Sequence, residues 1–264
     1  MLKNNWLSLT YHSLFILFIS APLLVVIAVS FTSLGYISLP TDGLSLRWFY
    51  AILDERQFID AFLMSAWLAL VSATVAIALA IPAALALANY RFPGRGALSA
   101  FFLSPLMIPH VVLGIAFLRF FNQAGFSGSF GWLSMTHVIV VFPYALRLTL
   151  ASVTGLSRDT ELAARSLGAR PHTVFLRIVL PLILPGVAGG WMLAFIQSFD
   201  EVTMTVFVAT PGTTTLPVAM YSYISQSIDP LVASLSTVLI VATMLTMFIL
   251  DRIVGLDRVL VGKN

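Results

Sequence analysis

Long apolar runs separated by short polar loops constrain this chain more than any other feature of its sequence. The runs fall at about residues 11–31, 61–88, 98–120, 132–150, 175–198 and 231–250. A helix that crosses the hydrocarbon core of a bilayer needs about 20 mainly apolar residues, so each run is long enough for one span. Only 9% of the residues are charged, whereas soluble domains carry about a quarter. We therefore predict an all-α integral membrane protein with six transmembrane helices in a single domain, residues 1–264.

The third apolar run contains two prolines, Pro105 and Pro109, followed directly by His110. Proline lacks a backbone N–H and its ring obstructs the preceding turn, so two prolines four residues apart kink a helix. The freed carbonyls then need partners from other parts of the protein or from water. We therefore predict a kinked third span, and a packed, hydrogen-bonded His110 rather than a histidine that acts as a ligand.

Basic residues are distributed unequally between the two sides of the predicted spans. If the N-terminus is cytoplasmic, that side carries Lys3, Arg91, Arg95, Arg147, Arg158, Arg165, Arg170, Arg177, Arg252, Arg258 and Lys263, and the other side carries Arg47, Arg56 and Arg119. Cytoplasmic loops are enriched in Lys and Arg, so this distribution predicts that both termini are cytoplasmic. Most acidic residues fall on the opposite side, and a net negative outer face favours a cationic solute.

A strongly polar segment follows the fourth run, and the stretch from Ser157 to Pro185 continues from it into the start of the fifth run. Its charge density excludes it from hydrocarbon, so it lies in water or against a protein partner. Its core, residues 159–170, predicts a short helix that Ser157 or Asp159 caps and that Gly168 and Pro171 end. An apolar face is expected at Leu162, Ala163, Ser166 and Leu167. The helix is therefore either a solvated loop helix or one that a partner grips.

This segment also carries the string A-A-x3-G-x9-I-x-L-P, from Ala163 to Pro181. The string resembles the EAA motif in permease subunits of binding-protein-dependent type I ABC importers, which have six spans. In that family the loop, here about residues 157–174, forms a cytoplasmic coupling helix that docks in a cleft of the ATPase subunit. The resemblance implies that the ATPase-coupling residues are Glu161, Ala163, Ala164 and Gly168. Glu161 stands one place before the usual motif glutamate, and one residue turns a helix side chain by about 100°.

Two adjacent carboxylates, Asp200 and Glu201, lie at the outer end of the fifth run. Carboxylates at membrane depth are costly and usually face a cavity or a partner. The following segment is too polar and too rich in Pro and Gly to span, yet too apolar for a plain solvated loop. Irregular backbone at that depth is tolerated where it lines a cavity or is buried in protein. The carboxylates therefore either line a pathway or mark the water interface.

The segment 198–237, from SFDEV to SLST, resembles the connection between the fifth and sixth spans of permeases for spermidine and putrescine. The strings YRFPGRG and SPLMIPHVVLGIAFL resemble the same subfamily. The resemblance implies a polyamine-type solute and a pathway lined by Asp200, Glu201, Phe199, Tyr221 and Tyr223, through charge pairing and cation–π contacts. Relatives of similar sequence carry other small solutes, including opines and amino-acid-like compounds, and their soluble binding proteins do most of the selection.

The resemblance also implies the partners. These are two ABC ATPase subunits on the inside, a second homologous permease, a periplasmic solute-binding protein outside, and the lipid bilayer of the bacterial inner membrane. ATP and Mg²⁺ would be bound by the ATPase, so no cofactor is expected in this chain. Nucleic acid is not expected as a partner, because the basic residues fall in short loops.

The sequence contains no constellation of residues typical of an enzyme. It has no G-x4-G-K-[ST] phosphate loop, no G-x-S-x-G elbow and no cysteine, and its four histidines are scattered. A secondary transporter remains an alternative, although such proteins usually show an inverted repeat and carboxylates at mid-span. A membrane-embedded enzyme is the second alternative, and it would need convergent acid–base or metal-binding residues on adjacent spans.

Overall fold

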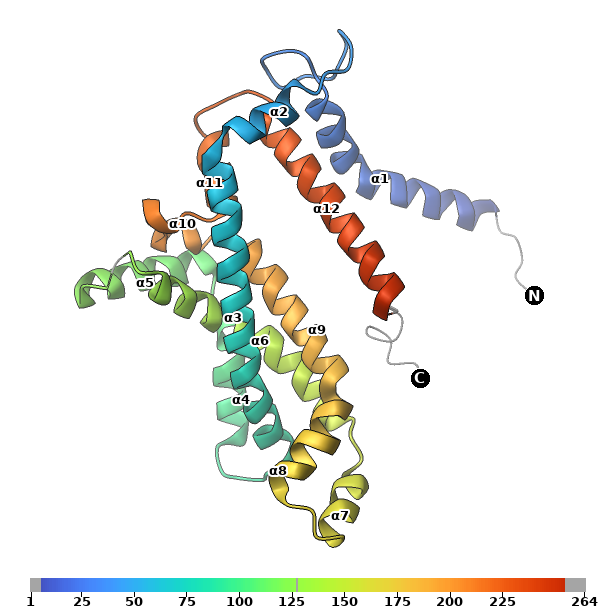
Figure 1. Ribbon diagram of the computed structural model, residues 1–264, viewed down its shortest axis with the longest axis vertical. Coiled ribbons are helices and arrows are strands. Elements are labelled where there is room, and N and C mark those ends of the chain that lie inside the picture. The colour runs from blue at the N-terminus through green and yellow to red at the C-terminus, as the bar shows by residue number, and fades with distance from the viewer. Residues whose placement is uncertain (1–5, 127, 255–264) are drawn as a thin grey trace. The chain divides into compact units, whose positions relative to one another are not determined.

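The computed structural model describes residues 6–126 and 128–254, and within them regular structure is helical apart from one isolated bridge, Thr32–Leu44 (Figure 1). The α-helices are α1 (Trp6–Ser30), α2 (Arg47–Asp54), α3 (Arg56–Asn89), α4 (Arg95–Leu103), α5 (His110–Ala124), α6 (Phe130–Thr154), α7 (Arg158–Ser166), α8 (Pro171–Val174), α9 (Leu180–Phe199), α10 (Thr205–Val208), α11 (Leu216–Ile224) and α12 (Leu231–Val254). The predicted all-α class is therefore confirmed.

Four helical segments of the described residues are long and apolar enough to cross a membrane. They are Ser8–Ser30, Arg56–Asn89, Phe130–Thr154 and Pro171–Phe199. A fifth crossing is formed if the bent pair Arg95–Leu106 and His110–Ala124 counts as one span. Helix α12 is apolar over Leu231–Leu245. The six-span count remains a prediction.

The predicted third span, residues 98–120, is broken rather than merely kinked. The two halves meet at an angle of 95°. Pro105 is the second residue of a short 3-10 turn, Ser104–Leu106, and Pro109 precedes α5 with an extended backbone, φ −56° and ψ 130°. A residue with that backbone cannot continue a helix, so α5 starts afresh at His110. The predicted effect of the prolines is confirmed, and it is larger than a kink.

The described chain forms two compact units: unit 1 contains residues 6–59 and 220–253, and unit 2 contains residues 60–219 and residue 254. The core of unit 2 is built on small residues of α3, with Ala73, Ala76, Ala80 and Ala84 fully buried. Small side chains let helix backbones approach closely in a membrane. At Gly186 on α9, a Cβ would stand 2.9 Å from the Leu148 carbonyl oxygen of α6. Helices α6 and α9 therefore pack closely side by side (Figure 1).

A π-helical segment, Phe175–Val179, joins α8 to α9. The Leu180 amide donates to the carbonyl of Phe175, five residues earlier. Pro181 has no N–H to donate to the carbonyl of Arg177, so regular α-helical bonding cannot pass this point. The polar segment between the fourth and fifth apolar runs therefore enters α9 through a widened turn.

Within unit 1, two side chains connect segments that are distant in the sequence. The hydroxyl of Ser234 on α12 donates to the carbonyl of Ser30 at the end of α1, at 3.1 Å. The indole of Trp48 on α2 donates to the carbonyl of Leu34, at 3.2 Å. These bonds satisfy polar groups of the buried residues Ser30, Ser234 and Trp48.

Candidate functional site

Helix α7 is built largely as the sequence predicts. The hydroxyl of Ser157 accepts a hydrogen bond from the Asp159 amide at 3.3 Å and caps the helix. Asp159 and Glu161 lie in the first turn and Arg165 in the last, the arrangement that the helix dipole favours. Gly168 adopts a φ of +85°, which residues with a side chain rarely adopt, and this conformation ends the helix. The observed helix, Arg158–Ser166, stops four residues earlier than predicted.

The apolar face predicted for this helix is exposed. Leu162 and Leu167 are 59% and 89% exposed, and Ala163 and Ser166 are exposed beside them. Ala164 points the other way and packs against the core of unit 2. No atom of the described chain lies within 4 Å of a Cβ built at Gly168. The face is thus left open on a polar loop, where large apolar side chains are unfavourable without a partner.

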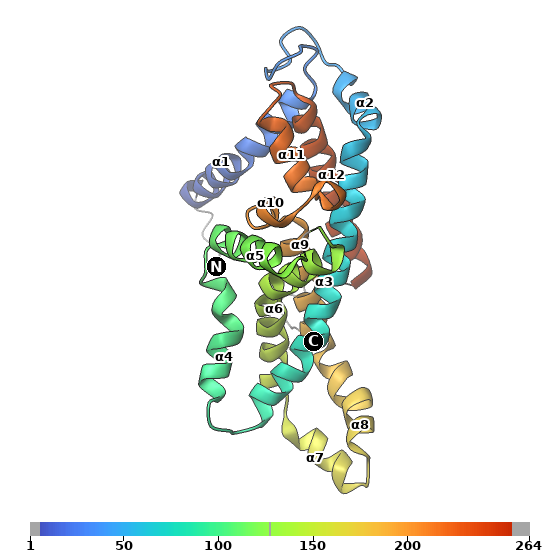
Figure 2. The same cartoon turned by 90° about the vertical axis from the view of Figure 1, so that its left-hand side faces the viewer.

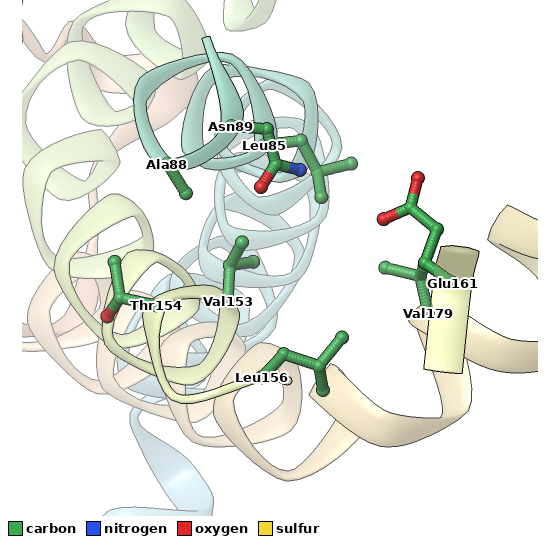
Figure 3. Close-up of a pocket in the computed structure, with 8 residues that line it drawn as sticks. All are labelled: Leu85, Ala88, Asn89, Val153, Thr154, Leu156, Glu161 and Val179. Atoms are coloured by element: carbon green, nitrogen blue, oxygen red, sulfur yellow. The ribbon is translucent and has the colours of Figure 1, made fainter. Parts of the chain in front are cut away.

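Glu161 points into the protein. Its carboxylate accepts a hydrogen bond from the Arg165 guanidinium at 2.6 Å and lines a hollow of about 130 Å³. Figure 3 shows the carboxylate directed toward the side of this hollow that carries Leu85 and Asn89, near the end of α3. The other walls come from the end of α6 and from Val179. Two of the four predicted coupling residues, Ala163 and Gly168, therefore face outward, and Glu161 and Ala164 face inward.

The carboxylates beyond α9 have different environments. Asp200 is exposed, and partial burial together with the charge of Glu201 raises the pKa of its carboxyl. Glu201 is only 8% exposed. One of its oxygens lies 2.6 Å from Nδ1 of His110, and the other accepts from the Met204 amide at 2.6 Å. Asp200 is therefore the accessible carboxylate, whereas Glu201 is held by the protein.

The hydrogen bond predicted for His110 is present, and the side chain is partly buried. The sequence did not reveal a second hydrogen-bonded histidine, the buried His137 on α6. Its Nδ1 lies 2.8 Å from the Ser198 hydroxyl, and its Nε2 lies 3.1 Å from the Thr205 hydroxyl. The two histidines fasten the segment that follows α9 to α5 and α6. These partners are 61 to 91 residues apart, so no local pattern could have paired them.

Phe199 belongs to an aromatic column that sequence reasoning also missed. Trp191, Phe195 and Phe199 follow one another on α9, with ring centroids 5.5 Å and 6.2 Å apart. Phe62 of α3 meets Phe199 edge-on at 5.9 Å. The four-residue spacing places these rings on one face of a helix, and that spacing could have revealed the column. All three α9 rings are half-buried, and the column ends beside Asp200.

Tyr221 and Tyr223, the other predicted pathway residues, lie on α11 in unit 1. Tyr221 is 59% exposed. Tyr223 packs its ring against Phe58 and donates its hydroxyl to Asp229 at 2.7 Å. Burial and this hydrogen bond raise the pKa of Tyr223 to about 12. The two tyrosines therefore differ, since only Tyr221 presents its side chain freely to solvent within unit 1.

No group of three or more metal-ligating side chains occurs among the described residues. The predicted pathway and coupling residues thus divide between two places in unit 2, the end of α9 and helix α7, with the two tyrosines in unit 1. In both views of unit 2, α7 and the turn from α3 to α4 lie at one end, and α5 lies well away from them (Figures 1 and 2).

The chain is similar to known membrane components of transport systems. The family model described as "Binding-protein-dependent transport system inner membrane component" matches residues 76–256. The spermidine/putrescine transport system permease protein PotC of Escherichia coli K12 is 29% identical over 98% of this chain and 95% of its own length. The putrescine transport system permease protein PotI of the same strain is 32% identical over 88% and 85%.

Another relative is named for a different solute. The putative 2-aminoethylphosphonate transport system permease protein PhnV of Salmonella paratyphi A is 32% identical over 91% of both chains. Among solved structures, a chain of a bacterial ABC transporter involved in the import of the acidic polysaccharide alginate shares the fold, with a TM-score of 0.73 at 14% identity over 94% of this chain and 95% of that one. The protein belongs to the family of inner membrane components of binding-protein-dependent transport systems.

Proposed function

We propose that this chain forms half of the translocation pathway of an ATP-driven importer for a small cationic solute of the polyamine type. The end of α9 is the observation that supports this class of solute. There an exposed carboxylate, Asp200, adjoins a column of three half-buried aromatic rings. Ammonium groups bind carboxylates by charge and aromatic rings by cation–π contact. The names of the PotC and PotI relatives support the same solute class.

A second candidate is an importer of another small solute, such as an amino-acid-like compound or an opine. The relative named for 2-aminoethylphosphonate supports it, because that compound carries both an amine and an anionic group. Asp200 would receive the amine in either case. The anionic group would need a cation, and the described residues at the end of α9 bring no arginine or lysine into contact with Asp200 or Glu201. The polyamine class is therefore the better fit.

The proposed partners are two separate ATPase subunits, a second homologous permease and a periplasmic binding protein. The exposed apolar face of α7 supports an ATPase partner, since it is the kind of small, open surface that a protein cleft covers. ATP and Mg²⁺ would bind to those subunits and not to this chain. The family description supports the binding protein.

The proposed mechanism is alternating access, with ATP closing the ATPase pair and moving α7. Gly168, α8 and the π-helical segment Phe175–Val179 connect α7 to α9. Because α9 packs closely on α6, a displacement of α7 would reach both helices. In the proposed orientation both termini and α7 are cytoplasmic, which the basic residues near α7 support.

The test is purification of the tagged chain from its native membranes in mild detergent, followed by mass spectrometry and by uptake assays on vesicles. We expect an ATPase and a second permease in stoichiometric amounts, and ATP-dependent uptake of putrescine in competition with spermidine. Competition by 2-aminoethylphosphonate and not by polyamines would support the second candidate. Isolation of the chain alone, also after gentler extraction, would contradict the importer assignment.

A further inference from the structure

Glu161 and Leu162 are neighbours on α7 whose side chains differ in exposure. The Glu161 side chain is 22% exposed and lines the hollow at the end of α3, whereas Leu162 is 59% exposed. One residue corresponds to a rotation of about 100° around a helix, so the two side chains cannot approach the same partner in the same way. A protein docked on the open face of α7 would meet Leu162 and Leu167 before Glu161.

Helix α7 packs against some of the neighbouring helices in its own subunit and is separated from others by a hollow. It packs on α8 and on the π-helical segment, while the hollow lined by Glu161 separates it from the ends of α3 and α6. A second, adjoining hollow is lined by Asn89, Tyr90, Glu161, Leu162 and Arg165. The ion pair Glu161–Arg165 therefore lies between α7 and the C-terminal end of α3. Figure 3 shows the Glu161 carboxylate on this side of α7.

That end of α3 is a favourable place for a cation. The last carbonyls of a helix have no partner within the helix, and they carry the negative end of its dipole. Arg165 lines the hollow beside Asn89, the last residue of α3, and Tyr90, which follows it. Glu161 holds the half-exposed Arg165 guanidinium at 2.6 Å, on the side of α7 where Arg165 lines this hollow.

We infer that Glu161 is a positioning residue inside its own subunit. Together with Arg165 it sets the rotation of α7 against α3, so that the face with Leu162, Ala163 and Leu167 points outward. It does not itself contact the ATPase. An exposed i,i+4 ion pair stabilises a protein only slightly, so the consequence lies in the direction of α7 and not in whether the chain folds. This inference rests on the proposed function, because it assumes an ATPase partner.

The first test moves the acid by one position. The variants are Glu161→Ala, Glu161→Gln, Leu162→Glu and the swap Glu161→Leu/Leu162→Glu, with Asp159→Asn as the control that removes an equal charge from the same turn. For Glu161→Ala we expect ATPase-subunit binding to change by less than about threefold, as for an exposed ion pair. ATP-dependent uptake should fall about tenfold, within the range of known coupling energies.

Glu161→Gln, which can still hydrogen-bond Arg165, should retain more uptake than Glu161→Ala, and the swap should not restore uptake. A loss of ATPase binding in Glu161→Ala that the swap restores would overturn the inference, since the acid would then act on the outward face. If the wild-type chain binds no ATPase at all, the proposed function fails instead, and the two failures are distinguishable.

A second measurement follows the position of α7 directly. The chain contains no cysteine, so Arg91→Cys and Thr160→Cys, both at exposed positions of unit 2, accept spin labels without background. The distance distribution between the labels should be narrow in the wild-type background, broad with Glu161→Ala and intermediate with Glu161→Gln. Equal widths in all three would contradict a positioning role. This readout needs neither ATPase nor transport.

Discussion

Nδ1 of His110, in the first turn of α5, lies 2.6 Å from a carboxylate oxygen of Glu201, just beyond the end of α9. The other Glu201 oxygen receives the Met204 amide. Close by, a Cβ at Gly114 would stand 2.8 Å from the ring of Phe207 and 3.0 Å from the Met204 carbonyl oxygen. The start of α5 is thus fixed to the segment after α9 by a polar pair and by close packing.

Removing one partner of this pair should destabilise unit 2. His110→Ala leaves a carboxylate that is 8% exposed without one of its two partners, and we expect a loss of about 1–3 kcal/mol. His110→Gln, which can still donate, should lose less. The check is the apparent Tm in detergent, with a double-mutant cycle to Glu201→Gln. Additive losses would show that the two side chains do not interact.

The raised pKa of Asp200 predicts that uptake depends on pH. Partial burial and the charge of Glu201 raise this pKa above its ordinary value of 3.8, so the carboxyl becomes neutral at a higher pH than an ordinary aspartate does. Uptake of a dication should therefore fall on acidification earlier than ordinary carboxylates protonate. Asp200→Asn should remove that part of the fall, whereas Asp42→Asn, an exposed control, should keep it. An unchanged profile in Asp200→Asn would exclude Asp200 as the group responsible.

The aromatic column predicts a selective effect on cations. Trp191→Leu and Phe195→Leu preserve apolar bulk but remove the ring, and a cation–π contact contributes about 0.5–2 kcal/mol. We expect dication uptake to fall several-fold, while a neutral solute accepted by the same system is little affected. Phe101→Leu, at an exposed ring of α4, is the control. Equal losses for both solutes would assign the column to packing.

Gly168 offers a test that separates backbone strain from contact with a partner. Its φ is +85° and its surroundings within the described chain are open. Asn tolerates this conformation whereas Val does not, so Gly168→Val should reorient the end of α7 and uncouple ATP hydrolysis from uptake. If Gly168→Asn uncouples as strongly, the added side chain clashes with the docked ATPase. Wild-type transport by both variants would contradict docking at this loop.

The helices and their ends follow largely from local sequence. Apolar run lengths located the main helices, Ser157 and Gly168 marked the limits of α7, and the proline pair marked the break before α5. The partners of Glu201 and His137 did not follow, because they lie far away in the sequence and apolar helices in a membrane carry little information about which face packs inward. The inward direction of Glu161 could not be predicted from the sequence either, because it depends on how α7 lies against the end of α3.

The π-helical segment Phe175–Val179 has a further consequence for the register of α9. A π turn accommodates one residue more than an α turn, and one residue corresponds to about 100° of rotation. Every side chain after it is offset by that angle from where a regular helix would place it, including Trp191, Phe195 and Phe199. The number of residues between the EAA-like loop and the aromatic column is therefore constrained as strictly as their identity. Deleting a single one would turn the column toward a different neighbour.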